Sequence, residues 1–478
     1  MTLNDKDFRI NVTSEIGSLR AVLIHSPDSG LGKVVPSKAQ DWLFEDIVHL
    51  DTLRKKEYDY YIKLLLYFLD PNKIKGNLDK VDIDRSFFKP DNKDFHASTK
   101  VLELQVLLSD ILQETDIRKK LVASVCAIEG CSYRMQLRLI DTDAVQLAKI
   151  FISGALNDDE MIFAPIPNLI FSRDIGIAIN NYVLLNKPAK KARFRETLLM
   201  RYIFFNHPLF ARFRDNILEI PETVHHFLRP GEDNEQKTTL EGGDVMMVSP
   251  DHLVIGCSER TSTSGADEAI KLLFEHNVVK KVTVVKIPNK RDYMHIDTVF
   301  TQVRRDMWVI LHSLAIAEKP EKEAGPAAWF ADKKSKEKTE IVQFRQGKKP
   351  KTFDNIEELL TDISHKDLGY EGEVKFIYSG NNTFPFDARE QWTDSCNLLA
   401  VKEGVVLGYD RNDKTVEAFI EQGFNIIPVA ELLQKFEQDE LNPQTLINTL
   451  VLIPSAELSR ARGGFHCMSM PLWREAIG

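Results

Sequence analysis

Five short apolar runs of three or four residues are spread along this chain of 478 residues. Each run has the length and composition of a buried strand, and four of the five lead directly into polar or turn residues. Residues 264–276 and 414–422, which follow two of the runs, have a helical pattern. Repeated units of strand, loop and helix predict an α/β protein with an internal repeat of ββα type, in which the loops after the strands face a common centre. The runs are residues 21–24, 182–185, 253–255, 308–311 and 405–407.

Two segments interrupt this repeat and define the expected domain organisation. Between about residues 100 and 156 the apolar residues recur at helical spacing, and Asp141 or Asp143 is placed to cap the last helix. The two apolar faces comprise Val101, Leu104, Leu108, Ile111 and Leu112, and then Val145, Ala148, Phe151 and Ile152. Residues 318–351 are rich in Lys, Glu, Pro, Ala and Gly, which is typical of an exposed loop. We expect one domain over residues 1–478, a helical subdomain inserted at 75–156, and a flexible insertion at 318–351.

Composition excludes several classes of protein. With 43% hydrophobic and 28% charged residues the chain is neither disordered nor fibrous. A net charge of −9 argues against nucleic-acid binding and is compatible with a cationic ligand, although acidic charge also serves solubility. No apolar run approaches the ~20 residues that span a membrane, and the polar start of the chain lacks a signal-peptide pattern. We expect a cytoplasmic protein without a membrane partner.

The five cysteines include no CxxC pair and no spacing typical of a metal site, so we expect reduced thiols and no metal. Cys467 differs from the other four because it follows a Gly-Gly pair that has a basic residue on either side, Arg462 and His466. Glycines allow close approach and unusual φ angles, and nearby cations lower the pKa of a thiol. Cys467 is therefore a candidate nucleophile, although a buried inert cysteine remains the alternative.

Three further segments contain polar residues that a core does not require. His295 and Asp297 are two residues apart, which on an extended segment places both side chains on one face, where an imidazole beside a carboxylate can act as acid or base. Glu241 and Asp244 flank a second Gly-Gly pair, and Asp174 follows an arginine. Each of these segments also has an alternative interpretation without a catalytic role. The His–Asp pair can be structural, the acidic residues beside the glycines can form a solvated turn, and Asp174 can form a local ion pair with the preceding arginine.

Taken together, a cysteine, a histidine and several carboxylates favour nucleophilic attack on a cationic, electron-poor carbon. A guanidinium fits this description, because it is planar and its paired N–H groups donate to carboxylates in bidentate fashion. Metal-dependent hydrolysis fits less well, because no His or Cys spacing supports zinc.

The chain resembles the arginine deiminase family of the guanidino-group-modifying superfamily over nearly its whole length. The resemblance implies an α/β fold of the pentein type, a five-fold pseudosymmetric ββαβ propeller with an inserted helical subdomain. A helical insertion after the first repeat resembles the deiminases of free arginine rather than other branches of the superfamily. The matching segments are residues 14–19, 43–47, 171–174, 195–198, 241–244, 258–261, 294–300, 389–392, 408–412 and 462–470.

The resemblance also assigns roles to individual residues. Cys467 matches the family's nucleophile, His295 its general acid and base, and Glu241 the carboxylate that orients this histidine. Asp174 and Asp297 match the pair that binds the guanidinium nitrogens. The substrate-binding positions comprise Arg193 and Arg260, which match the clamp on the substrate carboxylate, together with Asn168, Arg462, which matches a mobile arginine, and Leu43. Ile175, where many members have proline, and Tyr58, where histidine is common, depart from the family pattern outside the reacting groups.

The implied reaction is the hydrolysis of free L-arginine to L-citrulline and ammonia through a covalent thiouronium on the cysteine, without a cofactor. The family also implies a homo-oligomer, a dimer or a tetramer. Two other enzymatic readings stay open: an amidinotransferase that passes the amidine to an amine, and a deiminase of another guanidino compound. A non-catalytic arginine-binding relative is the alternative from a different class, against which the intact set of reacting residues argues.

Overall fold

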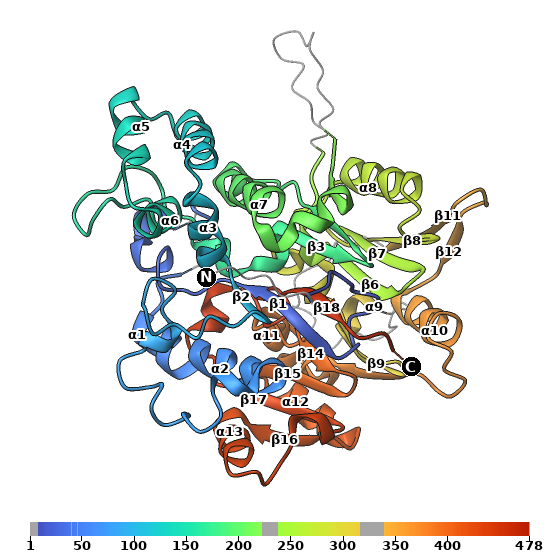
Figure 1. Ribbon diagram of the computed structural model, residues 1–478. Coiled ribbons are helices and arrows are strands. Elements are labelled where there is room, and N and C mark those ends of the chain that lie inside the picture. The colour runs from blue at the N-terminus through green and yellow to red at the C-terminus, as the bar shows by residue number, and fades with distance from the viewer. Residues whose placement is uncertain (1–7, 40, 45, 222–237, 316–338, 478) are drawn as a thin grey trace.

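The computed structural model describes residues 8–39, 41–44, 46–221, 238–315 and 339–477, and its strands form five separate sheets within these ranges (Figure 1). The sheets have the strand orders β18-β1-β2, β3-β4-β5, β12-β11-β8-β7-β6, β13-β10-β9 and β14-β15-β17-β16. Helices lie between and outside these sheets (Figure 1). The prediction of a mixed α/β fold is therefore confirmed.

The same connectivity recurs in four of the five sheets, and the fifth sheet joins the two ends of the chain. An antiparallel hairpin of two strands comes first, and the chain then returns, through a segment that contains a helix, to place a third strand parallel to the second. In one sheet β3 (Gly176–Ile179) pairs antiparallel with β4 (Tyr182–Leu185), α7 (Phe194–Asn206) follows, and β5 (Ile217–Glu219) pairs parallel with β4.

The second strand of each hairpin carries one of the five apolar runs. The next unit along the chain contains β6 (Val245–Ser249), β7 (His252–Cys257), α8 (Thr263–Glu275) and β8 (Lys281–Lys286). It is followed by a unit of β9 (Phe300–Arg304), β10 (Met307–Ile310), α10 (Ile356–Lys366) and β13 (Lys375–Tyr378). A further unit contains β14 (Leu399–Lys402), β15 (Val405–Tyr409), α12 (Asp413–Glu421), β16 (Asn425–Pro428), α13 (Val429–Glu437) and β17 (Thr449–Ile453). The two predicted helices, 264–276 and 414–422, correspond to α8 and α12 with ends shifted by one residue.

The first and last parts of the chain together form the remaining sheet. The last strand, β18 (Met470–Arg474), pairs antiparallel with β1 (Leu19–Ile24), and β2 (Val101–Glu103) pairs parallel with β1 on its other side. Between β1 and β2 the chain forms α1 (Leu50–Thr52) and α2 (Asp59–Leu69). Residues more than 440 positions apart therefore share one sheet, and this pairing places the segment before β18 beside the other sheets.

Four helices follow β2 where the sequence predicts helical structure: α3 (Leu104–Leu112), α4 (Thr115–Glu129), α5 (Tyr133–Ile140) and α6 (Ala144–Ser153). Asp143 caps α6 and accepts hydrogen bonds from the backbone N–H groups of residues 145 and 146. Two details of the prediction are wrong: Val101 lies in β2 because it completes the sheet with β1, and Val145 is exposed on the outer face of α6. The division into an inserted subdomain at 75–156 stays a prediction, and this range includes β2.

The structure describes only part of the predicted flexible insertion at 318–351. Residues 316–338 lie outside the described residues. Residues 340–345 form β11 (Glu340–Arg345), which pairs antiparallel with β8 on one side and with β12 (Lys351–Phe353) on the other. The expectation of an exposed loop is therefore wrong for this part. The reason is alternation within residues 340–345: Ile341 and Gln343 are buried on one face of the strand, and Val342 and Phe344, at the alternate positions, are half-buried.

Apolar side chains from these elements form three buried clusters. One lies between helices α3, α6 and α7 and the sheet of β3 to β5, a second around α2 and α13, and a third around α10 and the sheet of β9. The helix α9 (His312–Ala315) and the helix α11 (Phe386–Trp392) complete the described helices. None of the helices in the described ranges has both the length and the apolar character that crossing a bilayer requires.

Candidate active site

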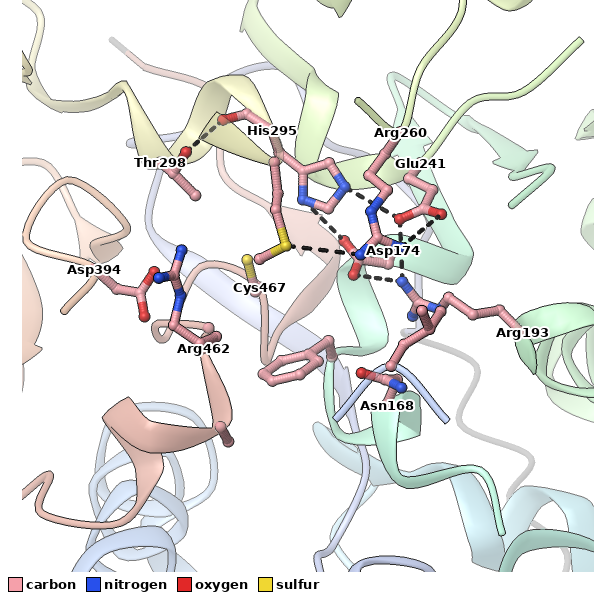
Figure 2. A pocket seen from close by; sticks show the side chains of 15 residues that line it. Asn168, Asp174, Arg193, Glu241, Arg260, His295, Thr298, Asp394, Arg462 and Cys467 are labelled. Atoms are coloured by element: carbon pink, nitrogen blue, oxygen red, sulfur yellow. Dashed lines mark hydrogen bonds and ion pairs between the residues drawn. The ribbon is translucent and has the colours of Figure 1, made fainter. Parts of the chain in front are cut away.

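Each of the five sheets has an edge strand whose preceding loop supplies a side chain to one pocket (Figure 2). The edge strands are β3, β6, β9, β14 and β18, and the side chains are those of Asp174, Glu241, His295, Asp394 and Cys467. The sequence predicts that the loops after the apolar runs face a common centre. In an antiparallel hairpin, the loop before the first strand and the loop after the second meet at the same end. Most of the predicted site residues come from the loops before the edge strands, at that end.

The pocket is almost closed. Its cavity volume is about 30 Å³, which is small but sufficient for an ordered water molecule. Most of the predicted site residues line it, whereas Asp297 is fully buried just behind the Cys467 sulfur. The lining residues are Leu43, Asn168, Phe171, Asp174, Arg193, Glu241, Arg260, Met294, His295, Thr298, Asp394, Ala461, Arg462, Gly463 and Cys467.

Cys467 lies three residues before β18 and is 5% exposed. Its Sγ is 3.3 Å from Asp297 Oδ2 and 3.1 Å from Asn397 Nδ2. Burial, followed by the negative charges of three carboxylates, raises the pKa of the Cys467 thiol well above its ordinary value. The carboxylates are those of Asp297, Asp174 and Asp394. The expectation that neighbouring cations lower this pKa is therefore wrong, because burial and the carboxylates outweigh the basic residues next to Cys467 in the sequence.

The glycines before Cys467 are required for space rather than for an unusual φ angle. A Cβ atom on Gly463 would lie 2.3 Å from the Phe171 ring, and one on Gly464 would lie 2.4 Å from the backbone oxygen of Asn397. The left-handed residue of this segment is instead Arg462, with φ of 62°. The Gly-Gly pair therefore allows the loops before β3 and β14 to approach the nucleophile closely.

His295 lies between two carboxylates. Its Nε2 is 3.1 Å from Glu241 Oε2, and its Nδ1 is 3.8 Å from Asp174 Oδ1. Gly243 makes room for the ring, since a Cβ atom there would lie 2.5 Å from Nδ1. Burial alone lowers the pKa of His295, but the charge of Asp174 and the hydrogen bond to Glu241 outweigh burial and raise the pKa to about 10. His295 is thus an imidazolium at neutral pH, able to donate a proton.

Glu241 is completely buried, so the alternative of a solvated acidic turn is wrong. Burial raises the pKa of Glu241, but Arg193 and His295 outweigh it and lower the pKa to about 2. Asp244, on the other side of the glycines, accepts hydrogen bonds from the Ile296 N–H group and from Ser258. It thereby fixes the loop that carries His295.

Asp297 does not share a face with His295, contrary to the expectation of an extended segment. Residues 296–298 form a turn of 3₁₀ helix, which directs Asp297 towards Cys467. Asp297 Oδ2 also lies 2.9 Å from His466 Nδ1, and His466 Nε2 lies 3.2 Å from Glu15 Oε2. Burial raises the pKa of Asp297, but the hydrogen bond and the charge of His466 outweigh it and lower the pKa. A carboxylate is therefore maintained beside the sulfur.

Several buried acceptor atoms lack a hydrogen-bond donor among the described residues, and two of them lie beside the Cys467 sulfur and His295. They are Asp174 Oδ1 and Asp297 Oδ1, one on each carboxylate of the pair predicted to bind a guanidinium. A buried carboxylate oxygen without a donor is costly, by about 1–3 kcal/mol or more. The pair is thus suited to accept N–H groups from a cationic ligand.

The two arginines of the predicted clamp contact the acidic residues of the pocket. Arg193 Nη1 is 2.7 Å from Asp174 Oδ2 and 3.2 Å from Glu241 Oε2, and its Nε donates to Glu196. Arg260 Nη1 is 4.0 Å from Glu241 Oε1. Within the described ranges, Arg193 Nη2 and Arg260 Nε are buried donors without an acceptor. Both side chains line the pocket, so these atoms could receive an anionic group.

Three other predicted contacts also line the pocket. Asn168 donates from Nδ2 to the backbone oxygen of Trp42, and Leu43 has a left-handed φ of 60°. The guanidinium of Arg462 lies over the ring of Trp392, 3.4 Å from its centroid, and Asp394 lies close to it (Figure 2). The structure therefore brings every predicted substrate contact to the same site.

Sequence reasoning missed three residues of this site: Asp394, Asn397 and His466. Asp394 and Asn397 precede the apolar strand β14 just as Asp174 precedes β3, so a search for polar residues before the first strand of each hairpin would have found them. Burial raises the pKa of Asp394 to about 7, against the opposing charge of Arg462. His466 was visible next to Cys467, but its two carboxylate partners depend on the tertiary structure.

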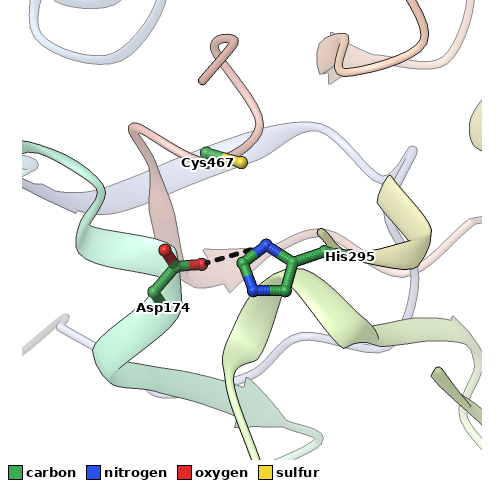
Figure 3. A group of neighbouring side chains, drawn as sticks. All are labelled: Asp174, His295 and Cys467. Atoms are coloured by element: carbon green, nitrogen blue, oxygen red, sulfur yellow. Dashed lines mark ion pairs between the residues drawn. The ribbon is translucent and has the colours of Figure 1, made fainter. Parts of the chain in front are cut away.

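Asp174, His295 and Cys467 offer three possible metal-ligand atoms within 4.8 Å of one another (Figure 3). The positive charge of His295 next to Asp174 opposes a metal ion at this place, because binding would require the imidazolium to lose its proton. Asp174 is also already paired with Arg193. The donor set fits a planar organic cation better than a metal.

Comparison with known proteins gives a consistent result. A family model described as arginine deiminase matches residues 142–474 of the chain. An arginine deiminase from Treponema denticola is 29% identical over 478 residues, covering 98% of this chain and 99% of the relative. An arginine deiminase from Staphylococcus aureus is 28% identical over 497 residues, covering 98% of this chain and 100% of the relative. Among solved structures, an amidinotransferase of the saxitoxin pathway from Microseira wollei aligns over 98% of each chain with a TM-score of 0.47 and 11% identity, a likeness too low to support an inference.

Proposed function

The chain belongs to the arginine deiminase family, and on this premise we propose that it hydrolyses free L-arginine to L-citrulline and ammonia. One observation carries the proposal: the Cys467 sulfur lies among carboxylates that retain buried oxygens without donors, Asp174 Oδ1 and Asp297 Oδ1. A guanidinium brings both the N–H donors that these oxygens need and the positive charge that the thiol needs.

The guanidinium is bound by Asp174 and Asp297, which place its carbon over the Cys467 sulfur. Such positioning supplies up to ~7–11 kcal/mol of the barrier in the best cases. The same cation offsets the negative charges that raise the pKa of the thiol. The thiol therefore loses its proton to solvent when the cation is bound, and a proton returns to the sulfur after product leaves.

The amino-acid end of the substrate is bound by two arginines. Arg193 Nη2 and Arg260 Nε, which make no hydrogen bond within the described residues, donate to the α-carboxylate. Asn168 and Leu43 line the same pocket near these arginines. Arg462 lines the pocket as well, over the ring of Trp392.

In the first half of the reaction the Cys467 thiolate attacks the guanidinium carbon. His295, an imidazolium held by Glu241, transfers its proton to one terminal nitrogen, and the C–N bond breaks to release ammonia. The product is a thiouronium, in which the carbon is bonded to the sulfur, and a neutral His295.

In the second half neutral His295 takes a proton from water as the hydroxyl oxygen attacks the same carbon. The C–S bond then breaks, the electron pair returns to the sulfur, and loss of the hydroxyl proton gives the citrulline carbonyl. That proton leaves with ammonia as ammonium, so one arginine cation and one water give one citrulline and one ammonium.

We further propose that the five sheets are the blades of a five-fold propeller with a helical insertion at 75–156. The support is that five ββαβ units each deliver a residue to one pocket from the loop before an edge strand. The homo-oligomer and the cytoplasmic location implied by the family resemblance remain predictions.

The test is to incubate the purified protein with L-arginine, agmatine and dimethylarginine, each with and without glycine as an amine acceptor. We expect equimolar citrulline and ammonia from arginine, with no effect of glycine. Formation of an amidino-glycine would identify an amidinotransferase instead. Ureido product only from agmatine or dimethylarginine would identify a different guanidino substrate.

A further inference from the structure

The side chain of Asn397 contacts Cys467 at two points. Its Nδ2 lies 3.1 Å from the Cys467 Sγ, and its Oδ1 accepts a hydrogen bond of 3.1 Å from the Cys467 backbone N–H. Asn397 is 1% exposed and comes from the loop before β14, 70 residues before Cys467 in the sequence. One amide group therefore binds both the backbone and the sulfur of the nucleophile.

The orientation of this amide follows from its partners. A backbone N–H can only donate, so the atom that faces it must be the oxygen Oδ1. The NH₂ group then faces the sulfur, and the choice between the two amide orientations does not depend on the sulfur contact itself. Asn397 is consequently a hydrogen-bond donor to Cys467 Sγ.

The surrounding backbone is shaped to hold Asn397 in this place. The backbone N–H of His466 donates to the Asn397 carbonyl at 3.5 Å. A Cβ atom on Gly464 would lie 2.4 Å from that carbonyl oxygen and 2.7 Å from Asn397 Oδ1. Only glycine at position 464 leaves room for Asn397, so the two loops are packed together around this contact.

The charges around the Cys467 sulfur indicate what the contact with Asn397 can do chemically. The other polar atom in contact with the sulfur is Asp297 Oδ2, an acceptor that opposes a negative charge on sulfur. Asp174 and Asp394 act in the same direction through their charges. A thiolate in this position is stabilised by an N–H donor, and Asn397 supplies one before substrate arrives.

We propose that Asn397 is a catalytic residue that stabilises the Cys467 thiolate through its Nδ2–H group and directs the sulfur towards the substrate carbon. This role rests on the proposed function, in which the thiolate exists twice per turnover: before attack and after the C–S bond breaks. The same donor favours attack by lowering the pKa of the thiol and favours product release by stabilising the leaving sulfur.

The test uses two substitutions of matched shape in the full chain. Asn397→Asp retains the acceptor for the Cys467 N–H but replaces the donor with a carboxylate oxygen. Asn397→Leu has the same branching and lacks both groups. The readout is the rate of Cys467 alkylation by iodoacetamide between pH 7 and pH 10, followed on its peptide by mass spectrometry. Cys257 and Cys396, in the same samples, report general accessibility.

A hydrogen bond to a charged group contributes about 1.5–3 kcal/mol, which corresponds to ~10–100-fold. We therefore expect both variants to alkylate Cys467 ~10–100-fold more slowly at each pH below the pKa of the thiol, and to lose kcat for citrulline formation by a similar factor. Asn412→Asp changes another buried asparagine, which bonds to Thr393 and not to the sulfur. Its alkylation profile should match that of the wild type.

Folded variants whose Cys467 alkylation profile equals that of the wild type would overturn the proposal. Failure of both variants to fold, with a normal Asn412→Asp control, would also overturn it, because Asn397 would then be chiefly structural. The alkylation measurement needs no arginine. A wild-type protein that forms no citrulline would thus refute the proposed function and leave the test of Asn397 intact.

Discussion

Arg193 Nη1 lies 2.7 Å from Asp174 Oδ2. Arg193 is the residue expected to bind the carboxylate of the substrate, and Asp174 is expected to bind its guanidinium, so the two ends of the substrate site are in direct contact. Both side chains are buried, and Arg193 also contacts Glu241 and Glu196. The protein's own guanidinium therefore partly neutralises these carboxylates. Arginine brings a second cation to this set, together with the carboxylate that the remaining donors of Arg193 and Arg260 can bind.

The first prediction concerns the nucleophile. Cys467→Ser should reduce citrulline formation by at least ~10³-fold, because a serine hydroxyl stays protonated where a thiol can ionise. Binding of arginine should persist, since the carboxylates and arginines are unchanged. Steady-state citrulline assays and isothermal titration calorimetry measure the two effects. A variant that retains a tenth of the wild-type rate would exclude the covalent mechanism.

The second prediction concerns the protonation of His295. The pKa of this histidine is about 10, because the raising effects of Asp174 and Glu241 outweigh the lowering effect of burial. Glu241→Gln removes one of the charges that raise it, so the imidazolium should lose its proton at a lower pH than in the wild type. NMR titration of protein with ¹⁵N-labelled histidine measures this, and the turnover rate near neutral pH should fall by about 10²-fold or more.

His252 provides the internal control for this titration. It is buried against Asp367 and Thr283, away from the pocket, and should titrate identically in both proteins. An unchanged pKa of His295 in Glu241→Gln would show that Glu241 does not hold the proton on the acid.

The third prediction concerns the carboxylate clamp. Agmatine, which lacks the α-carboxylate, should be a poor substrate, and Arg260→Met should raise the KM for arginine by ~10–100-fold, the equivalent of a hydrogen bond to a charged group. The same substitution should leave the weak activity on agmatine nearly unchanged. The steady-state kinetics of the wild type and the variant, each measured with both substrates, form a cycle that isolates the contact with the carboxylate. Equal losses for arginine and agmatine would show that Arg260 supports the pocket without contacting the carboxylate.

The fourth prediction concerns Asp394 and pH. Burial, against the opposing charge of Arg462, raises the pKa of this carboxyl to about 7. Between about pH 4 and pH 7 the unfolded chain has lost this proton and the folded chain has kept it, so the folded state becomes less stable as pH rises. The loss is complete above pH 7. Asp394→Asn should therefore stabilise the protein by ~2 kcal/mol more at pH 8 than at pH 5.

Urea unfolding of the wild type and the variant at both pH values measures this difference. Asp79→Asn, at an exposed position, is the matched control and should show no such dependence. An equal effect of Asp394→Asn at the two pH values would mean that Asp394 is ionised in the folded protein throughout.

The sequence by itself was sufficient for the α/β class, the five strands that carry the apolar runs, and helices α8 and α12. These features are local: a strand such as β4 or a helix such as α8 is determined by the spacing of its own apolar residues and by its capping residue. The motifs around His295 and Cys467 were readable for the same reason, because their residues are adjacent in the chain.

Tertiary structure alone decided the electrostatics of the site. Cys467 meets Asp297 and Asn397, which lie 170 and 70 residues away, and their burial together makes its pKa rise where the neighbouring basic residues suggested a fall. Charge and hydrogen bonding act through space, and their strength depends on how much water is excluded. Neither the distance between charges nor the exclusion of water can be read from residue spacing. The protonation of Cys467 and the ion pair between Arg193 and Asp174 therefore followed only from the packing of the five loops.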